Sequence, residues 1–423
     1  MGMKAYPTYK ESGVPWLGEI PEHWGISQYR AYFQERNSPN KNLQESNLLS
    51  ISYGKIIQKD INKTEGLLPA SFESYNIIED GDIVLRLTDL QNDHKSLRTA
   101  LCTQKGIITS AYVTLQPINQ TVNSAYFQYQ LHIYDVRKAI YGAGGGVRQA
   151  LNYDAIVRLK SCVPSVEEQN AIVAYLDKKC AEIDELVSRR QAIIERLKEL
   201  KQSIIAEAVT KGLNPDVPMK DSGIAWIGDI PQHWEIRRFA NEFLERRTKV
   251  SDQDYPPISV TKQGILPQLE KVAKTDNGDN RKLVRVGDFV INSRSDRKGS
   301  SGLSSYEGSV SLINHVLIPA PSWNRLFVHN LLRSVPFQEE FYKKGHGIVA
   351  DLWTTRYSDI ASSYIPFPPT DEQQAIAIYL DKKCSDIDEL VARQEQIIEK
   401  FKELKTSTIA HVVTGKVDVR DAI

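Results

Sequence analysis

The feature that most constrains this 423-residue chain is an internal repeat. The segment SGVPWLGEIPEHW at 12–24 returns as SGIAWIGDIPQHW at 222–234. A second segment of 47 residues starts at Pro164 and returns at Pro368, with 29 identical positions. The period of about 200 residues is far longer than the units of solenoid proteins. The sequence therefore predicts a tandem duplication, in which each half holds a short leader, a variable block and a long helix.

The join between the halves lies at 211–223 and is rich in residues that end helices. It contains Gly212, Pro215, Pro218 and Gly223, which is typical of a helix end followed by an extended linker. We expect six segments: a leader at 1–24, a first variable block at 25–163, a central helix at 164–212, a linker with the second leader at 213–234, a second variable block at 235–367, and a distal helix with a C-terminal tail at 368–423.

Apolar residues recur every seven positions in both long helices. The first seam holds Leu176, Ile183, Leu197 and Ile204, with Leu186, Ile193 and Leu200 three residues on; Leu380, Ile387, Phe401, Leu390, Ile397 and Leu404 occupy the matching positions of the second helix. This a/d heptad pattern predicts a coiled coil. The near-identity of the seams favours pairing of the two helices with each other, in antiparallel orientation, although each could instead pack on its own domain.

Each seam carries one polar residue near mid-helix, Arg190 in the first and Gln394 in the second. In an antiparallel pair these positions meet, and a polar layer of this kind fixes the register at some cost in stability. The alternative is that Arg190 extends outward to solvent and has no such role.

The two variable blocks match each other only at scattered anchors, such as GDIVLR at 81–86 and GDFVIN at 287–292. Short β-rich runs alternate with turns, and the stretches 126–140 and 325–335 have the pattern of helices. The fold class predicted is α+β, with two globular heads on the long helices. A repeated frame with diverged heads indicates that the heads do related but different jobs.

Charge is balanced overall, with 53 basic and 53 acidic residues, which excludes a nucleic-acid binder that works by bulk charge. Local loops are different, because Arg, Lys and Asn beside Gly and Ser suit contact with phosphates and base edges. A solvated surface loop is the alternative. The candidate DNA-binding residues are Arg86, Asn92, Lys95, Arg98, Arg148, Gln149, Asn292, Arg294, Arg297 and Lys298.

Motifs of catalysis are missing from the sequence. It has no Walker A motif, no HExxH, and no Asn/Asp-Pro-Pro-aromatic loop of amino-methyltransferases. The four cysteines form no CxxC pair, so neither a zinc site nor a disulfide scaffold is expected. No run of 18 apolar residues is present. We expect a cytoplasmic, non-catalytic chain with no catalytic residue, metal site or membrane partner.

The leaders repeat a histidine beside a tryptophan, as His23 with Trp24 and His233 with Trp234. Duplication of the pair favours a structural or docking role over catalysis. The candidate residues for docking a partner are Trp16, Trp24, Trp226 and Trp234.

These motifs together resemble the specificity subunits of type I restriction–modification systems. The resemblance is carried by both leaders, by the helix starts PSVEEQNAIVAYLDKK and PPTDEQQAIAIYLDKK, and by the junction EAVTKGLNPDVPMKDSGIAWIG. It implies that each head is a target-recognition domain for one half of a bipartite DNA site, and that the two helices form an antiparallel coiled-coil spacer in a pseudo-twofold frame.

The resemblance also implies the partners. Two modification subunits would dock on the helices and leaders, bind S-adenosylmethionine and methylate adenine in double-stranded DNA. Restriction subunits would supply ATP-driven, Mg-dependent translocation and cleavage, so that this chain itself holds no cofactor. Three alternatives remain open: a stand-alone two-headed DNA-binding repressor, a nuclease with an unfamiliar site, and a coiled-coil adaptor for protein ligands.

Overall fold

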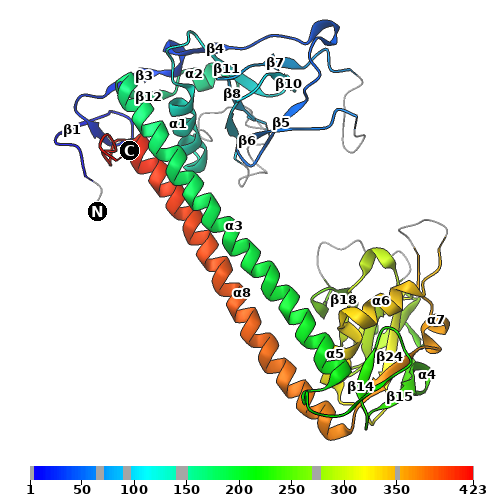
Figure 1. The fold of residues 1–423 in the computed structure, drawn as a ribbon. Coiled ribbons are helices and arrows are strands. Elements are labelled where there is room, and N and C mark those ends of the chain that lie inside the picture. Colours follow the sequence, from blue (N-terminus) through cyan, green and yellow to red (C-terminus); the bar gives the residue numbers. More distant parts are fainter. Residues whose placement is uncertain are drawn as a thin grey trace. The chain divides into compact units, whose positions relative to one another are not determined.

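The computed structural model describes residues 4–62, 71–88, 97–139, 151–268, 278–347 and 353–422. By its internal contacts the chain divides into two compact units. Unit 1 is Met1–Arg190 with Gln396–Ile423, and unit 2 is Gln191–Glu395. Each unit contains one leader, one variable block and a part of each long helix (Figure 1).

Unit 1 is centred on a four-stranded antiparallel sheet with the order β4-β11-β8-β9. These strands are β4 (Phe33–Glu35), β8 (Ile83–Leu85), β9 (Thr99–Leu101) and β11 (Val113–Pro117). Smaller two-stranded pairs join β1 (Tyr9–Glu11) to β2 (Glu19–Pro21), β3 (Gly25–Gln28) to β12 (Lys160–Val163), β5 (Leu49–Ser52) to β6 (Lys55–Gln58), and β7 (Asn76–Ile78) to β10 (Gly106–Ile108). The helices of the block are α1 (Ser124–Val136) and α2 (Tyr153–Val157), with short turns at η1 (Tyr29–Ala31) and η2 (Lys41–Leu43).

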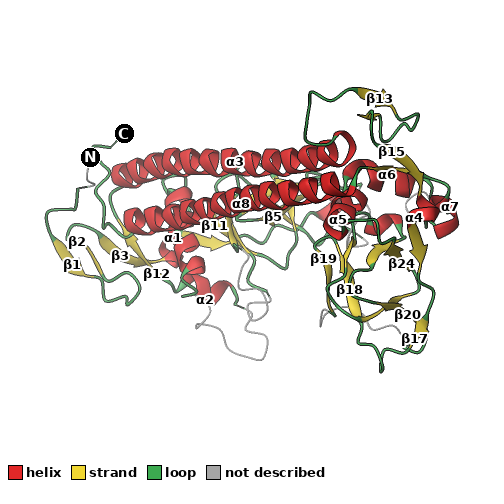
Figure 2. Ribbon diagram, turned by 90° about the horizontal axis from the view of Figure 1, so that it is seen from below, coloured by secondary structure: helices red, strands yellow, loops and turns green. Residues whose placement is uncertain are grey.

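Unit 2 repeats this topology, with the order β16-β24-β21-β22 in its four-stranded sheet. The strands are β16 (Phe243–Glu245), β21 (Phe289–Asn292), β22 (Ser301–Leu303) and β24 (Asn314–Pro319). Around them lie the pairs β13 (Met219–Asp221) with β14 (Asp229–Pro231), β15 (Glu235–Arg238) with β25 (Tyr364–Phe367) and β18 (Ile258–Thr261) with β19 (Gly264–Pro267), and the trio β17 (Lys249–Val250), β20 (Arg281–Val284) and β23 (Gly308–Ser311). The helical elements are α4 (Phe239–Glu242), η3 (Ser295–Arg297), α5 (Arg325–Arg333), α6 (Val335–Lys343) and α7 (Tyr357–Ala361). Figure 2 separates these strands from the helices by colour.

The short sequence match between the blocks marks one turn that is built in the same way in both units. Gly81 and Gly287 adopt φ of 86° and 87°, a region that glycine enters without a steric penalty. The aspartate that follows each glycine caps the turn and pairs with an arginine, Asp82 with Arg36 and Asp288 with Arg246. The matched Gly-Asp pair therefore forms the turn that precedes β8 in unit 1 and β21 in unit 2.

The long helices are α3 (Val166–Lys211) and α8 (Thr370–Val413). In unit 1 Lys405 of α8 contacts Asp184 of α3 at 2.6 Å, and in unit 2 Lys201 of α3 contacts Asp388 of α8 at 2.7 Å. These are the same pair with the copies exchanged, because Lys201 and Lys405, like Asp184 and Asp388, are equivalent in the repeat. Within unit 1 the beginning of α3 also shares a core with the end of α8, so the two segments run antiparallel there.

The buried face of the helices differs from the heptad prediction. Ile172, Ile183, Ile194 and Ile205 in α3, and Ile376, Ile387, Ile398 and Ile409 in α8, recur every 11 residues and are at most 8% exposed. Leu186, Ile193, Leu200, Leu390 and Leu404, predicted for the seam, are 38–51% exposed. Eleven residues fill three turns at about 3.67 per turn, close to a straight helix, whereas heptad positions drift by about 20° per repeat. These five positions therefore rotate out of the contact, whereas Leu176, Ile183, Leu380 and Ile387 of the predicted seam are buried.

Arg190 and Gln394, the predicted register pair, stand on either side of the division between the units, and their pairing stays a prediction. Among the described residues, no helix is both long and apolar enough to cross a membrane. The cysteines Cys102, Cys162, Cys180 and Cys384 are all free thiols.

Candidate nucleic-acid interface

Unit 2 holds a cleft of about 720 Å³ between the β18–β19 hairpin, the segment that follows β21, and the turn that joins β23 to β24. Three of the residues predicted to bind DNA line it, Asn292, Arg294 and Arg297. Among the described residues that line it, Lys262, Arg281, Arg294 and Arg297 are basic and Asp296 is acidic. The remaining walls are mostly Ser, Thr, Asn and aliphatic side chains. The cleft is thus an electropositive, hydrogen-bonding surface.

Asp296 orients the basic groups at the cleft. The Arg294 guanidinium donates two hydrogen bonds to it, from Nε at 2.8 Å and from Nη2 at 3.0 Å. Arg297 lies 3.8 Å from the same carboxylate, and its side chain is 68% exposed. One carboxylate shared by two guanidinium groups leaves a net positive charge, and a forked pair holds Arg294 in a defined orientation.

Arg281 forms the inner wall of the cleft and is itself buried. Its Nε donates to Ser309 Oγ at 2.8 Å and its Nη2 to the Ser309 carbonyl at 3.1 Å. Burial lowers the pKa of Arg281, and the Asp252 carboxylate opposes this shift. An arginine remains charged under all ordinary conditions, so a positive charge stays fixed behind the cleft.

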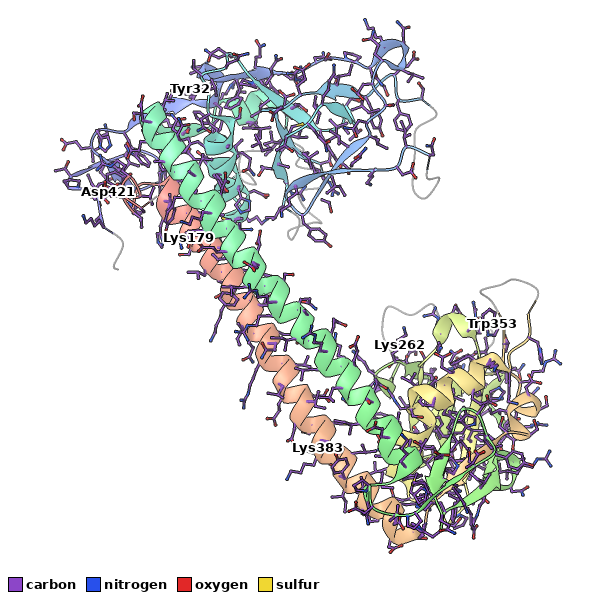
Figure 3. All side chains as sticks on the ribbon, in the orientation of Figure 1. Tyr32, Lys179, Lys262, Trp353, Lys383 and Asp421 are labelled. Carbon is purple, nitrogen blue, oxygen red and sulfur yellow. The ribbon has the colours of Figure 1, made fainter. Side chains whose placement is uncertain are left out.

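A second arginine, the half-buried Arg333 at the end of α5, positions the hairpin rim. Its Nη2 donates to the Lys262 carbonyl at 2.7 Å and its Nη1 to the Ser301 carbonyl at 2.6 Å. The two bonds tie the β18–β19 turn to β22. Figure 3 labels Lys262 on this turn, and Trp353 at the same end of unit 2. Trp353 accepts a backbone hydrogen bond from Ser295, next to the cleft arginines.

The remaining candidates of unit 2 have other surroundings. Asn292 accepts the backbone N–H of Arg294 through Oδ1 at 3.0 Å, so it shapes the turn as well as lining the cleft. Lys298 does not line the cleft; its ammonium group pairs with Glu339 on α6. Lys298 is therefore the weakest of the four predicted contacts in this unit.

In unit 1 the prediction for Arg98 is wrong. Arg98 is fully buried, and its Nη1 donates to the carbonyls of Thr88 at 2.6 Å and Arg86 at 3.2 Å. Its backbone N–H donates to Asp135 at 2.6 Å. An arginine in the interior that holds loop carbonyls is not available to DNA. Arg86 is half-buried, and Asn92, Lys95, Arg148 and Gln149 lie outside the described residues.

Sequence reasoning missed Lys262, which lines the cleft beside the predicted arginines. The available signal was the run ISVT-KQ-GILP, two strand-like segments around two polar residues, which is typical of a hairpin tip. The same pattern, LSIS-YG-KIIQ, occurs at 49–58 in the first block.

The repeated tryptophans mostly serve the interior of their own unit. Trp24 and Trp234 are buried in the two hydrophobic cores, so their rings are not available to a partner and that docking prediction is wrong. Trp16 packs edge-on against Tyr134 and Trp226 against Phe337, both half-buried, and a docking role for them stays a prediction.

The neighbouring histidines join each leader to the start of a long helix. His23 Nε2 lies 3.0 Å from Glu168 of α3, and His233 Nε2 lies 2.5 Å from Glu372 of α8. Glu168 also accepts the Tyr6 hydroxyl, and Glu372 accepts Trp234 Nε1. Each histidine thus contacts a first-turn glutamate, which also accepts a hydrogen bond from Tyr6 in unit 1 and from Trp234 in unit 2, an arrangement that supports the predicted structural role.

No model of a known protein family matches the chain. Over 96% of its length it is 23% identical to the "Putative type I restriction enzyme MjaX specificity subunit" of Methanocaldococcus jannaschii, of which 96% is covered. It is 21% identical to the "Type I restriction enzyme EcoBI specificity subunit" of Escherichia coli, over 60% of this chain and 57% of that protein.

The fold is also that of a solved protein. A chain from the structure described as the basis of complex assembly and conformational transition of the type I R-M system matches with a TM-score of 0.66 at 16% identity, covering 93% of this chain and 98% of that one. The resemblance inferred from the leaders and helices is thereby confirmed: over nearly its whole length this chain is similar to a type I restriction enzyme specificity subunit, and its fold is that of a chain from a type I R-M system.

Proposed function

We propose that this chain is the DNA sequence-specificity subunit of a type I restriction–modification complex. Each variable block reads one half of an asymmetric bipartite site, and the two long helices, paired as an antiparallel coiled coil in a duplicated frame, separate the two blocks. The observation that carries the proposal is the cleft of unit 2, where four basic side chains face one carboxylate. Its walls supply both the charge that attracts phosphates and the amide and guanidinium groups that distinguish bases.

The cleft residues divide by the contacts they suit. At the rim, the half-buried Arg294 and the exposed Arg297 suit guanine edges or phosphates, and Asn292 suits an adenine edge. Arg281 is buried behind them and contributes long-range attraction without contact. The corresponding segment of unit 1 differs in sequence, so the two half-sites differ as well.

The apolar residues left exposed on the helices are the proposed docking surface for the modification subunits. Leu186, Ile193 and Leu200 on α3 are equivalent in the repeat to Leu390, Ile397 and Leu404 on α8. Exposed apolar residues at helical spacing are a typical surface for a partner helix. Because the set occurs once per helix, two copies of one partner are expected.

The chemistry is proposed to lie in the partners. Modification subunits would bind S-adenosylmethionine and methylate adenine, and restriction subunits would use ATP and Mg. The chain itself would act without catalysis in the cytoplasm, as a DNA-binding component of defence against foreign DNA.

Methylome sequencing tests this function. The chain and the modification subunit encoded by the same genome are expressed together and separately in a host without other methyltransferases. We expect one asymmetric, bipartite methyladenine motif that requires both chains. Retained DNA binding by the chain alone without a motif would favour the repressor, cleavage by the chain alone the nuclease, and neither binding nor motif the adaptor.

Removing the rim charges tests the cleft. The double variant Arg294→Ala/Arg297→Ala should bind its DNA site at least tenfold more weakly, with a log–log salt slope smaller by about 2 if both contact phosphates. The matched control Arg238→Ala removes an exposed charge of the same unit outside the cleft and should change affinity little. An unchanged affinity and salt slope in the double variant would exclude the cleft from the interface.

A further inference from the structure

The β5–β6 hairpin of unit 1 ends in an exposed tyrosine whose backbone is in an unfavourable region. Ser52 is paired with Lys55, so the turn consists of Tyr53 and Gly54 alone. Their φ values are 48° and 74°, and a two-residue turn with both φ positive is the type I′ turn, which favours Asn-Gly. Tyr53 is 89% exposed, so its ring gains no packing that would offset the strain. A bulky residue retained in such a conformation is a sign of function.

The tip of this hairpin lies against the segment that precedes β9. A Cβ placed on Gly54 would lie 3.2 Å from Leu97 Cβ and 3.6 Å from the Thr99 carbonyl. Between these two residues stands the buried Arg98, which holds the carbonyls of Arg86 and Thr88. The tip therefore borders Leu97 and Thr99, on either side of the buried Arg98.

Unit 2 has the same juxtaposition at its cleft. The turn of the β18–β19 hairpin is Lys262 and Gln263, because Thr261 is paired with Gly264. A Cβ placed on Gly299, two residues before β22, would lie 4.0 Å from Lys262 Cγ, just as Leu97 stands two residues before β9. Tyr53 thus occupies in unit 1 the position that Lys262 occupies on the cleft of unit 2.

The hairpin of unit 1 also has the charge of a DNA-binding surface. Residues 49–59 include Lys55 and Lys59 and no acidic residue. Both lysines are exposed, and within the described part of the chain neither forms a salt bridge. An ammonium group beside the tip, that of Lys55, and a second at the open end of the hairpin, that of Lys59, suit the phosphates that flank a groove.

We propose that Tyr53 is a sequence-reading contact of unit 1, inserted into a groove of the DNA half-site, and that Lys262 is its counterpart in unit 2. The inference rests on the proposed function and assigns residues to it. The tyrosine ring offers an apolar face for a thymine methyl group and a hydroxyl for a base edge, whereas the lysine offers a cationic donor suited to guanine. The same position therefore makes the two half-sites different.

The variant Tyr53→Asn distinguishes a role in DNA recognition from a role in folding, because it introduces the favoured Asn-Gly turn and removes the aromatic ring. We expect a melting temperature equal to or above that of the wild type. In the co-expressed complex we expect at least tenfold slower methylation of the wild-type site, or relaxed base preference, in one half-site only. Tyr53→Gly, which also relieves the turn, should behave in the same way.

Leu43→Asn is the matched control, because Leu43 of unit 1 is likewise exposed and has a positive φ of 52°. It should leave both half-sites unchanged. If the wild-type complex gives no bipartite motif, the proposed function fails before any variant is scored. If the wild type gives the motif and folded Tyr53→Asn and Tyr53→Gly give the same motif at the same rate, the role of Tyr53 is overturned.

Discussion

At the scale of single residues, Glu245 joins the interior of unit 2 to its cleft. The carboxylate is buried and lies 2.8 Å from His315 Nδ1, 2.7 Å from Arg247 Nε and 3.1 Å from Lys282 Nζ. Lys282 also donates to the carbonyl of Asn314, which lines the cleft. Burial alone would raise the pKa of Glu245, but the hydrogen bonds from His315, Arg247 and Lys282 outweigh it and lower the pKa to about 2.

The depressed pKa of Glu245 predicts how the stability of unit 2 depends on pH. The ordinary value is 4.5, so the ionised carboxylate stabilises the fold fully above about pH 5 and loses this contribution as the pH falls toward 2. Glu245→Gln should lower the free energy of unfolding by roughly 3 kcal/mol at pH 7. The difference from the wild type should shrink steadily below pH 5. Urea unfolding at several pH values measures both effects.

The exposed Glu195 on α3 provides the control for this prediction, because its side chain is 57% exposed and pairs only with Lys198. Glu195→Gln should change stability by well under 1 kcal/mol at every pH. A wild-type to Glu245→Gln difference that stayed constant from pH 7 to pH 3 would contradict the role assigned to the carboxylate.

Residue type and local sequence pattern correctly predicted three residues that line the cleft, but they wrongly predicted that Arg98 would be available to DNA. Arg297 and Arg98 both stand in the connection between two sheet strands, β21 to β22 and β8 to β9, and no local signal separates them. Their difference arises in three dimensions, since Arg98 is surrounded by loop carbonyls that it satisfies and Arg297 meets solvent. Tyr53 was missed for the opposite reason, because a tyrosine is an unusual choice for a type I′ turn.

At the scale of elements, each long helix carries two apolar stripes with different periods. The isoleucines at 11-residue spacing face the interior, and the heptad leucines Leu186, Leu200, Leu390 and Leu404 are exposed. A search for sevenfold repeats finds only the heptad stripe, because an 11-residue spacing does not match that period. The existence and the length of the helices were predictable from the repeat, whereas the face that is buried depends on how straight the pair runs.

Two adjacent isoleucines of α3, one from each stripe, allow the roles of the two stripes to be tested separately. Ile194 is 1% exposed and Ile193 is 38% exposed. Ile194→Ala should lower the free energy of unfolding by about 2–4 kcal/mol, because it leaves a cavity in the interior. Ile193→Ala should cost less than about 1 kcal/mol, yet reduce co-purification with the modification subunit. Equal destabilisation by the two variants would show that the buried face has been assigned wrongly.

At the scale of the whole molecule, three features occur once in each unit. They are the lysine–aspartate ion pair of the long helices, the histidine–glutamate contact of the leader, and the strand order of the four-stranded sheet. Lys405–Asp184 and Lys201–Asp388 each join residues of different copies, whereas His23–Glu168 and His233–Glu372 each join residues of the same copy. Each unit is completed by the far end of the other copy's helix, which the linear order of the segments does not reveal. The sequence was sufficient to predict the duplication, but the packing of each helix end into the unit of the other copy is seen only in the three-dimensional contacts.

If the helices set the distance between the half-sites, shortening both by one burial period should shorten the DNA spacer. Deleting 185–195 from α3 and 389–399 from α8 leaves Ile183 and Ile205, and likewise Ile387 and Ile409, at the spacing of one period. The rise of 1.5 Å per residue then removes about 16 Å, or about five base pairs. Selection from a library with random spacer lengths should recover both half-sites with a correspondingly shorter spacer.

The control variant carries a five-residue deletion in each helix, 185–189 in α3 and 389–393 in α8. It turns the following helix by about 140°, so that isoleucines on the two sides of the deletion cannot face the interior together. This variant should lose cooperative unfolding and the bipartite site. The prediction distinguishes a spacer from a scaffold, because a scaffold that only holds partners would select the original spacer with shortened helices. An unchanged spacer in the folded 11-residue variant would therefore mean that the separation of the half-sites is set outside α3 and α8.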